Sequence, residues 1–229
     1  MTELQIIEHP SPNRDARPDG QAIDILLLHY TGMASGAAAL ERLCDPAARV
    51  SAHYLIEEDG RVFQLVPESE RAWHAGSAEW QGASDINARS IGIEVVNPGH
   101  EFGYRPFPAE QMASVKLLAL DILARHPIPA ARVLCHSDVA PLRKEDPGEF
   151  FDWRGLAAAG IGLWPQDGGA AVLESAVGKA LKRVGYGYTE EDPAAVIRAF
   201  QRHFRPGAVT GTADAETRRR LAALLAVID

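Results

Sequence analysis

The chain is poor in cysteine, in long apolar segments and in positive charge, and each shortage excludes a class of protein. It has two cysteines, Cys44 and Cys135, which is too few for a disulfide framework. No apolar run is long enough to cross a bilayer, so we expect no membrane span. With a net charge of -8 the chain lacks the basic surface that phosphate binding requires, so we expect no nucleic-acid partner.

The N-terminus also lacks the basic stretch followed by an apolar segment that marks an export signal. We therefore expect a cytoplasmic protein. A chain trimmed of its signal peptide would look the same, and a periplasmic location is then the alternative. What the sequence does contain is 46% apolar and 24% charged residues, the composition of a globular protein that can build a core. We expect a monomer.

The chain up to about residue 160 reads as strands and helices in alternation. The run at 24–29 is almost wholly apolar, which indicates a central strand, and 109–125 has apolar residues at a helical period. Further strands are predicted at 52–57, 61–66, 90–96 and 132–135, the first two forming a hairpin around Asp59-Gly60. This order predicts an α/β fold with a mixed central β-sheet flanked by helices.

The composition changes near residue 160. Residues 161–169 are rich in Gly and Pro and read as a linker, and three helical segments follow at about 171–184, 193–203 and 214–227. Asp192 and Asp214 are placed to cap the second and third of them. We therefore predict two domains, at 1–165 and at 170–229, the second a small three-helix module.

The segment from Cys135 to Gly148 concentrates His, Lys and carboxylate side chains directly after a predicted strand. Its Pro and Gly residues predict a loop and not a helix. His136 and Asp146 are of ligand types that zinc accepts, and Lys144 could stabilise an oxyanion. A solvated surface turn is the alternative for the loop, and a solvent-exposed side chain is the alternative for Lys144.

Two residues on other predicted strands complete a candidate site. His29 ends the first apolar strand, where it could join His136 and Asp146 as a third ligand and leave one tetrahedral position open. It could otherwise be a histidine hydrogen-bonded at a strand end. Glu94 shares a strand face with Gly92, opposite Ile91, and a carboxylate there is costly unless it is paired or used. A general base is one interpretation, and a salt bridge to Arg89 is the other.

Five segments between about residues 22 and 155 carry a resemblance to a known enzyme family. In chain order they are Leu28-His29-Tyr30-Thr31, Ser51-Ala52-His53-Tyr54, Ala72-Trp73-His74-Ala75-Gly76, Asn87 through Glu94, and His136 through Gly148. Together they resemble the zinc-dependent N-acetylmuramoyl-L-alanine amidases of the type 2 amidase family. The tail, at 199–206 and 211–217, resembles a peptidoglycan-binding module, and the two-part arrangement is most similar to the AmiD-like branch of the family.

The resemblance implies a role for each candidate residue. The family's zinc ligands fall on His29, His136 and Asp146, its catalytic glutamate on Glu94 and its catalytic lysine on Lys144. One Zn²⁺ ion and Glu94 would activate water, while Lys144 and the ion would stabilise the tetrahedral oxyanion. The implied reaction is hydrolysis of the amide between N-acetylmuramic acid, or its 1,6-anhydro form, and L-alanine of the stem peptide. The expected partners are peptidoglycan fragments, in cell-wall recycling or turnover.

Other polar residues in the matching segments are candidates for substrate binding: His53, Trp73, His74, Asn87 and Arg89. The two histidines could equally be structural, Trp73 could pack instead of stacking on a sugar, and Arg89 could only neutralise Glu94. We expect His9, His100, His126 and His203 to be surface or packing residues, and Asp138 and Glu145 to be bystanders. A non-catalytic peptidoglycan recognition protein of the same fold is the alternative function, although all three predicted ligands are present.

Overall fold

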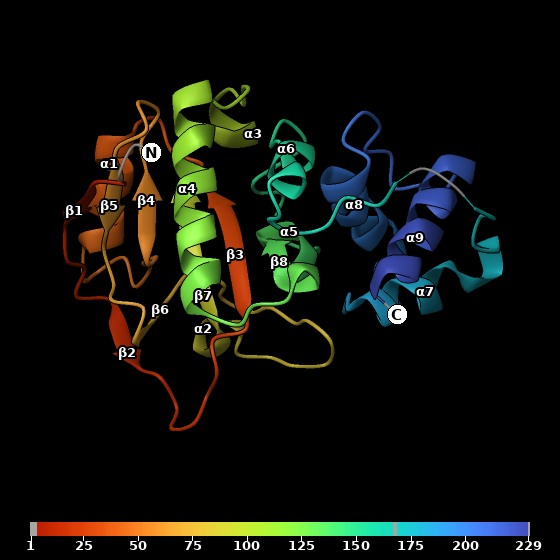
Figure 1. Cartoon of the computed structure of the whole chain (residues 1–229), viewed down its shortest axis with the longest axis horizontal. Coiled ribbons are helices and arrows are strands. Elements are labelled where there is room, and N and C mark those ends of the chain that lie inside the picture. The colour runs from red at the N-terminus through yellow and green to blue at the C-terminus, as the bar shows by residue number, and fades with distance from the viewer. Residues whose placement is uncertain (1–3, 167–168, 229) are drawn as a thin grey trace.

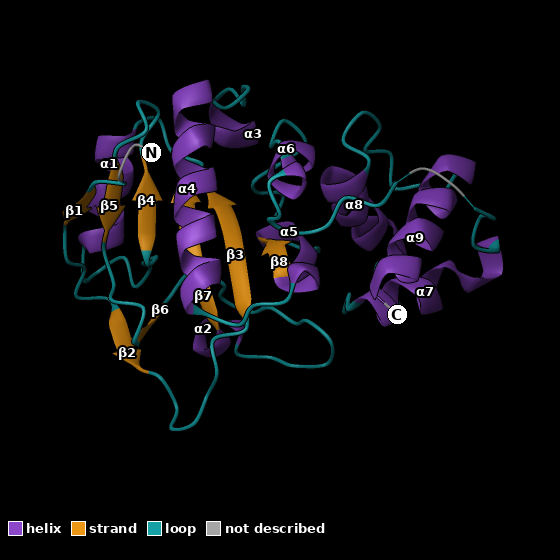
Figure 2. Ribbon diagram, in the orientation of Figure 1, coloured by secondary structure: helices purple, strands orange, loops and turns teal. Residues whose placement is uncertain are grey.

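The computed structural model of the chain describes residues 4–166 and 169–228. Outside that part of the chain lie the outer ends of the two predicted domains, at 1–3 and 229. Residues 167–168 of the predicted linker also lie outside it. Figures 1 and 2 show that one half of the molecule is built around a sheet and that the other half is helical.

The main sheet is mixed, as predicted. Its strands are β1 (Ile6–Glu8), β5 (Val62–Gln64), β4 (Tyr54–Ile56), β7 (Ser90–Val95), β3 (Ile25–Tyr30) and β8 (Val133–Cys135), in that spatial order. Strands β4 and β5 form the predicted antiparallel hairpin, and the other described neighbours in this sheet pair in parallel. Strands β2 (Arg14–Ala16) and β6 (Glu70–Ala72) form a separate antiparallel pair.

The helices before residue 160 include the predicted helix at 109–125. They are α1 (Gly36–Cys44), α2 (Ile86–Arg89), α3 (Gly99–Phe102), α4 (Ala109–Arg125), α5 (His136–Val139) and α6 (Trp153–Ala158). The tail contains α7 (Val177–Val184), α8 (Pro193–Phe204) and α9 (Ala215–Ile228), with 3-10 turns at Ala130–Arg132 and Glu174–Ala176. Asp192 and Asp214 accept bonds from Ala195 N and Thr217 N, at 2.9 Å each, and so cap α8 and α9 as predicted.

The central strand β3 is buried on both faces, which explains its continuous apolar sequence. Leu26 and Leu28 belong to the cluster that packs under α4, which Figure 1 shows lying across the sheet. Ile25 and Leu27 belong to a second cluster on the opposite face. Because side chains alternate along a strand, His29 lies on the same face as Ile25 and Leu27. Its side chain therefore projects on the face away from α4.

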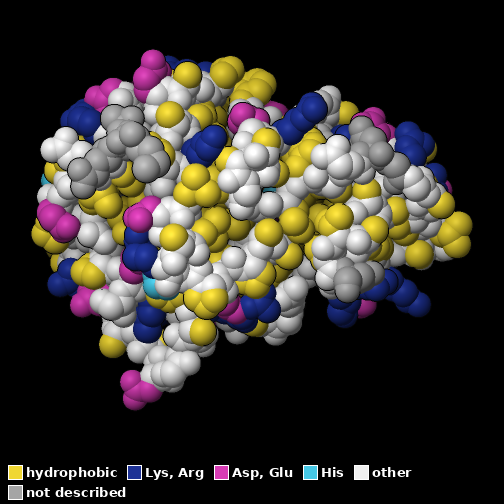
Figure 3. Space-filling model, in the orientation of Figure 1, with side chains coloured by type: hydrophobic (Ala, Val, Ile, Leu, Met, Phe, Trp, Pro, Cys, Tyr) yellow, Lys and Arg dark blue, Asp and Glu magenta, His cyan; other side chains and the backbone are white. Residues whose placement is uncertain are grey.

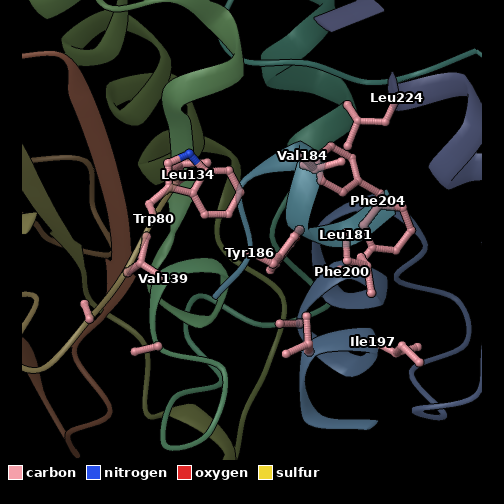
Figure 4. Close-up of a cluster of buried hydrophobic side chains, with 14 of the residues drawn as sticks. Trp80, Leu134, Val139, Leu181, Val184, Tyr186, Ile197, Phe200, Phe204 and Leu224 are labelled. Carbon is pink, nitrogen blue, oxygen red and sulfur yellow. The ribbon is translucent and has the colours of Figure 1, made fainter. Parts of the chain in front are cut away.

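The helices of the tail complete this second cluster. Figure 4 shows Trp80, Leu134 and Val139 meeting Tyr186, Phe200 and other side chains of the tail, and all of these are buried. The Trp80 and Tyr186 rings meet edge to face with centroids 5.0 Å apart. Tyr186, Phe200 and Phe204 thus belong to a core that the tail shares with the sheet.

Two predicted stretches differ from the structure. The segment after Cys135 was expected to be loop throughout, but one helical turn, α5, forms before Pro141. The Asp138 carboxylate favours this turn because it accepts a bond from Cys135 N at 3.0 Å. The predicted helix at 171–184 begins only at Val177, because Val172 N bonds instead to the Arg218 carbonyl at 3.2 Å.

The surface of the described residues carries charges of both signs. Figure 3 shows basic and acidic side chains interspersed on one face, and the sheet half and the helical half touching along it. Within residues 4–166 and 169–228, none of the helices has both the length and the apolar character needed to cross a membrane.

Candidate active site

The candidate residues meet at the carboxyl ends of three adjacent parallel strands. His29 of β3 is paired in register with Glu94 of β7. On the other side of β3, Leu28 is paired with Cys135, and the chain then turns into α5 at His136. Neighbouring parallel strands end at the same edge of a sheet, which is where α/β proteins usually bind their ligands. The fold thus brings together residues that are more than a hundred positions apart.

Three ligand-type atoms converge at this edge. His29 Nδ1 lies 2.9 Å from His136 Nδ1 and 3.1 Å from Asp146 Oδ2, and His136 Nδ1 lies 3.0 Å from the same oxygen. All three side chains are buried. Among the residues that the structure describes, this set is one of two His, Cys, Asp and Glu groups compact enough to hold a metal ion.

The proton of His136 lies on the nitrogen that faces away from this cluster. His136 Nε2 is 3.0 Å from the carbonyl oxygen of Ala75, which can only accept, so Nε2 carries the hydrogen. Arg143 Nη2 is 3.4 Å from the same nitrogen, but its two hydrogens go to the carbonyls of Ala75 and Ser77. His136 Nδ1 therefore presents a lone pair toward Asp146 and His29.

The charge states of the other two members suit a cation. Burial, followed by the effect of His136, lowers the pKa of His29 to about 4, so this imidazole is neutral near pH 7. Burial alone would raise the pKa of Asp146, but the neighbouring His136 and His29 outweigh it and leave the carboxyl ionised. Two imidazole nitrogens and one carboxylate are a donor set that zinc accepts, with one position left open. These residues therefore fit a zinc ion.

Glu94 lines a cavity beside this cluster. Its neighbours Ile91, Ile93 and Val95 pack under α4, so the predicted alternation of this strand is confirmed. Burial, and then the negative charge of Asp146, raise the pKa of Glu94 well above its ordinary value. Its Oε2 is buried without a hydrogen-bond partner among the described residues. An unpartnered carboxylate oxygen with a raised pKa is suited to accept a proton.

The alternative of a salt bridge between Glu94 and Arg89 is wrong. Arg89 lies just before β7, at the opposite edge of the sheet, and its Nε donates to Asp24 Oδ1 at 2.8 Å. The extended strand between Arg89 and Glu94 keeps the two side chains far apart. Arg89 therefore lies away from the candidate site, and its predicted role in substrate binding has no support from this position.

Lys144 lies at the junction of two cavities. The first, of about 180 Å³, is lined by residues that include Glu94, Lys144, Asp146, Trp73 and Met33. The second, of about 330 Å³, is lined by Tyr30, Gly32, His100 and Arg143 among others, and it shares Lys144 and Asp146 with the first. The two cavities, which we together call the cleft, share Lys144 and Asp146; His136 lines the first of them, and His29 lines neither.

The remaining predicted substrate contacts divide into two groups. Trp73 and His74 line the smaller cavity. His53 and Asn87 are buried and absent from the lining of either cavity. His53 contacts the Glu70 carbonyl and accepts from Gly92 N at 2.9 Å, while the Asn87 amide oxygen accepts from the backbone of residues 74 and 75. Their polar atoms are engaged inside the protein, so the structure favours a structural role.

A buried polar cluster behind the site was not predicted. Asp138 was expected to be a bystander, yet its carboxylate accepts from Tyr186 Oη at 2.6 Å and from His203 Nδ1 at 2.7 Å. Both Asp138 and His203 are almost fully buried. Cys135, which is also buried, completes the second metal-sized group with these two residues. The only signal in the sequence was the position of His203 inside an apolar helical pattern.

Comparisons with known proteins agree with the resemblance in the sequence. The family model described as N-acetylmuramoyl-L-alanine amidase matches residues 19–149. N-acetylmuramoyl-L-alanine amidase AmiD of Escherichia coli K12 is 39% identical, over 97% of this chain and 91% of that protein. The 1,6-anhydro-N-acetylmuramyl-L-alanine amidase AmpD of the same organism is 37% identical, over 63% of this chain and 86% of that protein.

A solved structure is similar over the tail as well as over the sheet. It is the complex of the E. coli amidase AmiD with anhydro-N-acetylmuramic acid-L-Ala-D-gamma-Glu-L-Lys. The two chains are 38% identical and superpose with a TM-score of 0.81 over 92% of each. The expected fold class is therefore confirmed.

Proposed function

Since the chain belongs to the N-acetylmuramoyl-L-alanine amidase family and is an amidohydrolase, we propose that it cleaves the amide between the muramic acid and L-alanine. The observation that carries this proposal is the convergence of His29, His136 and Asp146, two of which, His136 and Asp146, line the same cavity as Glu94 and Lys144. The named substrates of its relatives favour a 1,6-anhydro muropeptide, in cell-wall recycling or turnover.

We assign one Zn²⁺ ion to the three converging ligand atoms. A bound zinc ion acidifies water and polarises a carbonyl, so it would supply a nucleophile and an electrophile at neutral pH. The protein's own contribution is the fixed geometry of two imidazole nitrogens and one carboxylate oxygen in a buried pocket. The outward-facing proton of His136 helps to hold that geometry.

Glu94 and Lys144 supply the proton transfer and the charge stabilisation. The unpartnered Oε2 of Glu94 takes the proton of the attacking water and can then deliver it to the leaving amine of L-alanine. Lys144 lines the same cavity, where its ammonium faces the negative charge that develops on the carbonyl oxygen. The cleft extends to both sides of this point, which allows a sugar on one side and a peptide on the other.

The division into a catalytic domain at 1–165 and a peptidoglycan-binding-like module at 170–229 remains a proposal. The helices α7, α8 and α9 share a hydrophobic cluster with β3, so this module packs on the sheet as part of one core. We therefore expect removal of residues 170–229 to expose apolar side chains of the sheet half and to make it aggregate. The monomeric state and the cytoplasmic location also remain predictions, which ultracentrifugation and cell fractionation would test.

Digestion of defined substrates tests the proposed reaction. Purified zinc-loaded protein should release free stem peptide beginning with L-alanine from anhydro-muropeptides, and mass spectrometry of both products identifies the bond cut. Intact sacculi digested in parallel show whether the polymer is also accepted. If the protein bound muropeptides but left the lactyl-alanine bond intact, the alternative function, peptidoglycan recognition without catalysis, would be correct.

Substitution of Asp146 tests the metal site. Asp146→Ala removes the one carboxylate of the ligand set, and we expect bound zinc to fall from one ion per chain to near zero in a dialysed sample. Zinc measured by atomic emission, together with the thermal midpoint with and without added zinc, checks this result. Glu145→Ala is the matched control, because this neighbouring carboxylate is about half exposed and pairs with Arg202. Equal zinc contents in the two variants would contradict the assignment of Asp146.

A further inference from the structure

His74 and Ser90 form a hydrogen-bonded chain behind His29. His74 Nδ1 lies 3.0 Å from His29 Nε2, and His74 Nε2 lies 3.2 Å from Ser90 Oγ. Ser90 is fully buried, and its hydroxyl donates to the Ile86 carbonyl oxygen at 2.6 Å. We propose that His74 and Ser90 are positioning residues that fix the tautomer and the orientation of His29. This inference rests on the proposed zinc site.

The direction of every bond in the chain follows from its last member. A carbonyl oxygen only accepts, so the single hydroxyl proton of Ser90 points to Ile86 and leaves Oγ as an acceptor. His74 must then donate from Nε2. A neutral imidazole carries one ring hydrogen, so with that hydrogen on Nε2 its Nδ1 presents a lone pair to His29 Nε2.

The lone pair of His74 decides the tautomer of His29. Because His74 Nδ1 accepts, His29 donates from Nε2 and keeps its own lone pair on Nδ1. That nitrogen is the one that lies beside His136 Nδ1 and Asp146 Oδ2. Three acceptor atoms therefore face one another with no proton between them, an arrangement that a cation stabilises.

The backbone next to His74 serves the second histidine ligand. The Ala75 carbonyl accepts from His136 Nε2, so residues 74 and 75 orient both imidazoles of the ligand set. Asn87 fixes this dipeptide, because its Oδ1 accepts from His74 N at 3.0 Å and from Ala75 N at 2.7 Å. Asn87, predicted as a substrate contact, thus supports the same arrangement.

Gly92 provides the space that the His74 ring occupies. A Cβ atom added at Gly92 would lie 2.5 Å from Cγ and Nδ1 of His74, closer than real contacts allow. The group that approaches this glycine closely is therefore the imidazole of His74. A methyl group at this position would push the ring away from His29.

The test compares variants that remove and restore the acceptor. His74→Leu and Ser90→Ala should each weaken zinc binding by about 10–100-fold, the usual effect of losing a residue that orients a metal ligand. His74→Asn can place an amide oxygen near the position of Nδ1 and should recover part of the affinity. Competition with a chromophoric chelator measures the affinity, and urea unfolding of each metal-free variant shows whether it is folded.

Steric displacement gives an independent test with a matched control. Gly92→Ala leaves the chemistry of His74 and Ser90 intact but should weaken zinc binding to a similar extent by displacing the ring. Gly178→Ala in α7 is the control, because a Cβ there meets nothing within 4 Å, and its zinc affinity should be unchanged.

Nitrogen-15 spectra of the zinc-loaded wild-type protein report the tautomer directly. We expect His74 to carry its proton on Nε2 and to show an unprotonated Nδ1 that accepts a hydrogen bond. A proton on Nδ1, or wild-type zinc affinity in folded His74→Leu, would overturn the inference and leave the proposed function intact. A wild-type protein that binds no zinc would overturn both.

Discussion

Glu94→Gln protein should bind zinc as tightly as the wild type and hydrolyse muropeptides about 10²–10⁴-fold more slowly. Glutamine has nearly the same shape as glutamate but cannot accept the proton of the attacking water. The ligand atoms belong to His29, His136 and Asp146, and Glu94 is not one of them, so the metal site should remain. The expected result is therefore a loss of turnover without a loss of metal.

The position of Glu94 explains why so large an effect is expected. Its Oε2 has no partner within the described structure, so no other hydrogen bond has to break before it takes a proton. Burial raises its pKa, followed by the charge of Asp146, while Lys144 partly opposes this rise. A raised pKa makes a carboxylate a stronger base than it is in water.

Single-turnover rates and zinc content, measured on the same preparations, check this prediction. Lys144→Met is the companion variant, and it should also keep its zinc but lose rate, because it removes positive charge from the same cavity. Glu110→Gln is the control, since this exposed carboxylate lies on α4, on the opposite face of the sheet from His29, and lines neither cavity. Near-normal turnover in Glu94→Gln protein would show that another group is the base.

The candidate site was predictable because it depends on strand ends. Apolar runs located β3, β7 and β8, and His29, Glu94 and His136 each lie at or just beyond the carboxyl end of one of them. Parallel pairing then places His29, Glu94 and His136 together without any knowledge of side-chain conformation. The pattern of polar residues after apolar strands therefore contained most of the information about the site.

The roles of the supporting residues were not predictable in the same way. The direction of hydrogen bonds from Ser90 through His74 depends on rotamers contributed by separate segments, and no periodicity in the sequence encodes a rotamer. His53 and His74 occur in similar sequence contexts, yet His53 is fully buried whereas His74 lines the cavity. Arg89 was associated with Glu94 by proximity in sequence, but an extended strand separates them.

A second large effect, on stability, is expected from substitution of Asp138, although this residue touches no substrate. Asp138→Ala should lower the free energy of unfolding by about 3–5 kcal/mol, because each buried donor left without an acceptor costs about 1–3 kcal/mol. The change would leave three buried donors without an acceptor: Cys135 N, Tyr186 Oη and His203 Nδ1. These donors come from β8, from the chain after α7 and from α8, so the carboxylate joins the tail to the sheet.

The packing around His203 adds to this expectation. Its ring is stacked between Trp153 and Phe204, with centroids 3.9 Å from each, and so cannot turn to find another partner. Burial by itself would raise the pKa of Asp138, but His203 and the other donors outweigh it and leave the pKa lowered. The interaction spans 65 positions in the sequence, which is why no local pattern revealed it.

Urea unfolding of the metal-free proteins measures the effect on stability. Glu145→Gln is the control, because its bond to Arg202 joins the same helix α8 to the loop that follows α5, but Glu145 is 48% exposed. We expect that change to cost less than about 1 kcal/mol. If Asp138→Ala and Glu145→Gln lowered the free energy of unfolding by similar amounts, the explanation by buried donors that lose their acceptor would be wrong.

The same variant distinguishes a hydrogen-bonded cluster from a second metal site. Cys135, Asp138 and His203 are close enough together to hold an ion, but the Asp138 oxygens already accept three hydrogen bonds. Wild-type protein should therefore bind one zinc ion per chain. Asp138→Ala protein should also bind one ion per chain, but with lower affinity. The weaker binding follows because α5 begins at His136, so the loss of its capping carboxylate loosens that ligand. A wild-type content of two ions, falling to one in Asp138→Ala, would show that the cluster holds metal.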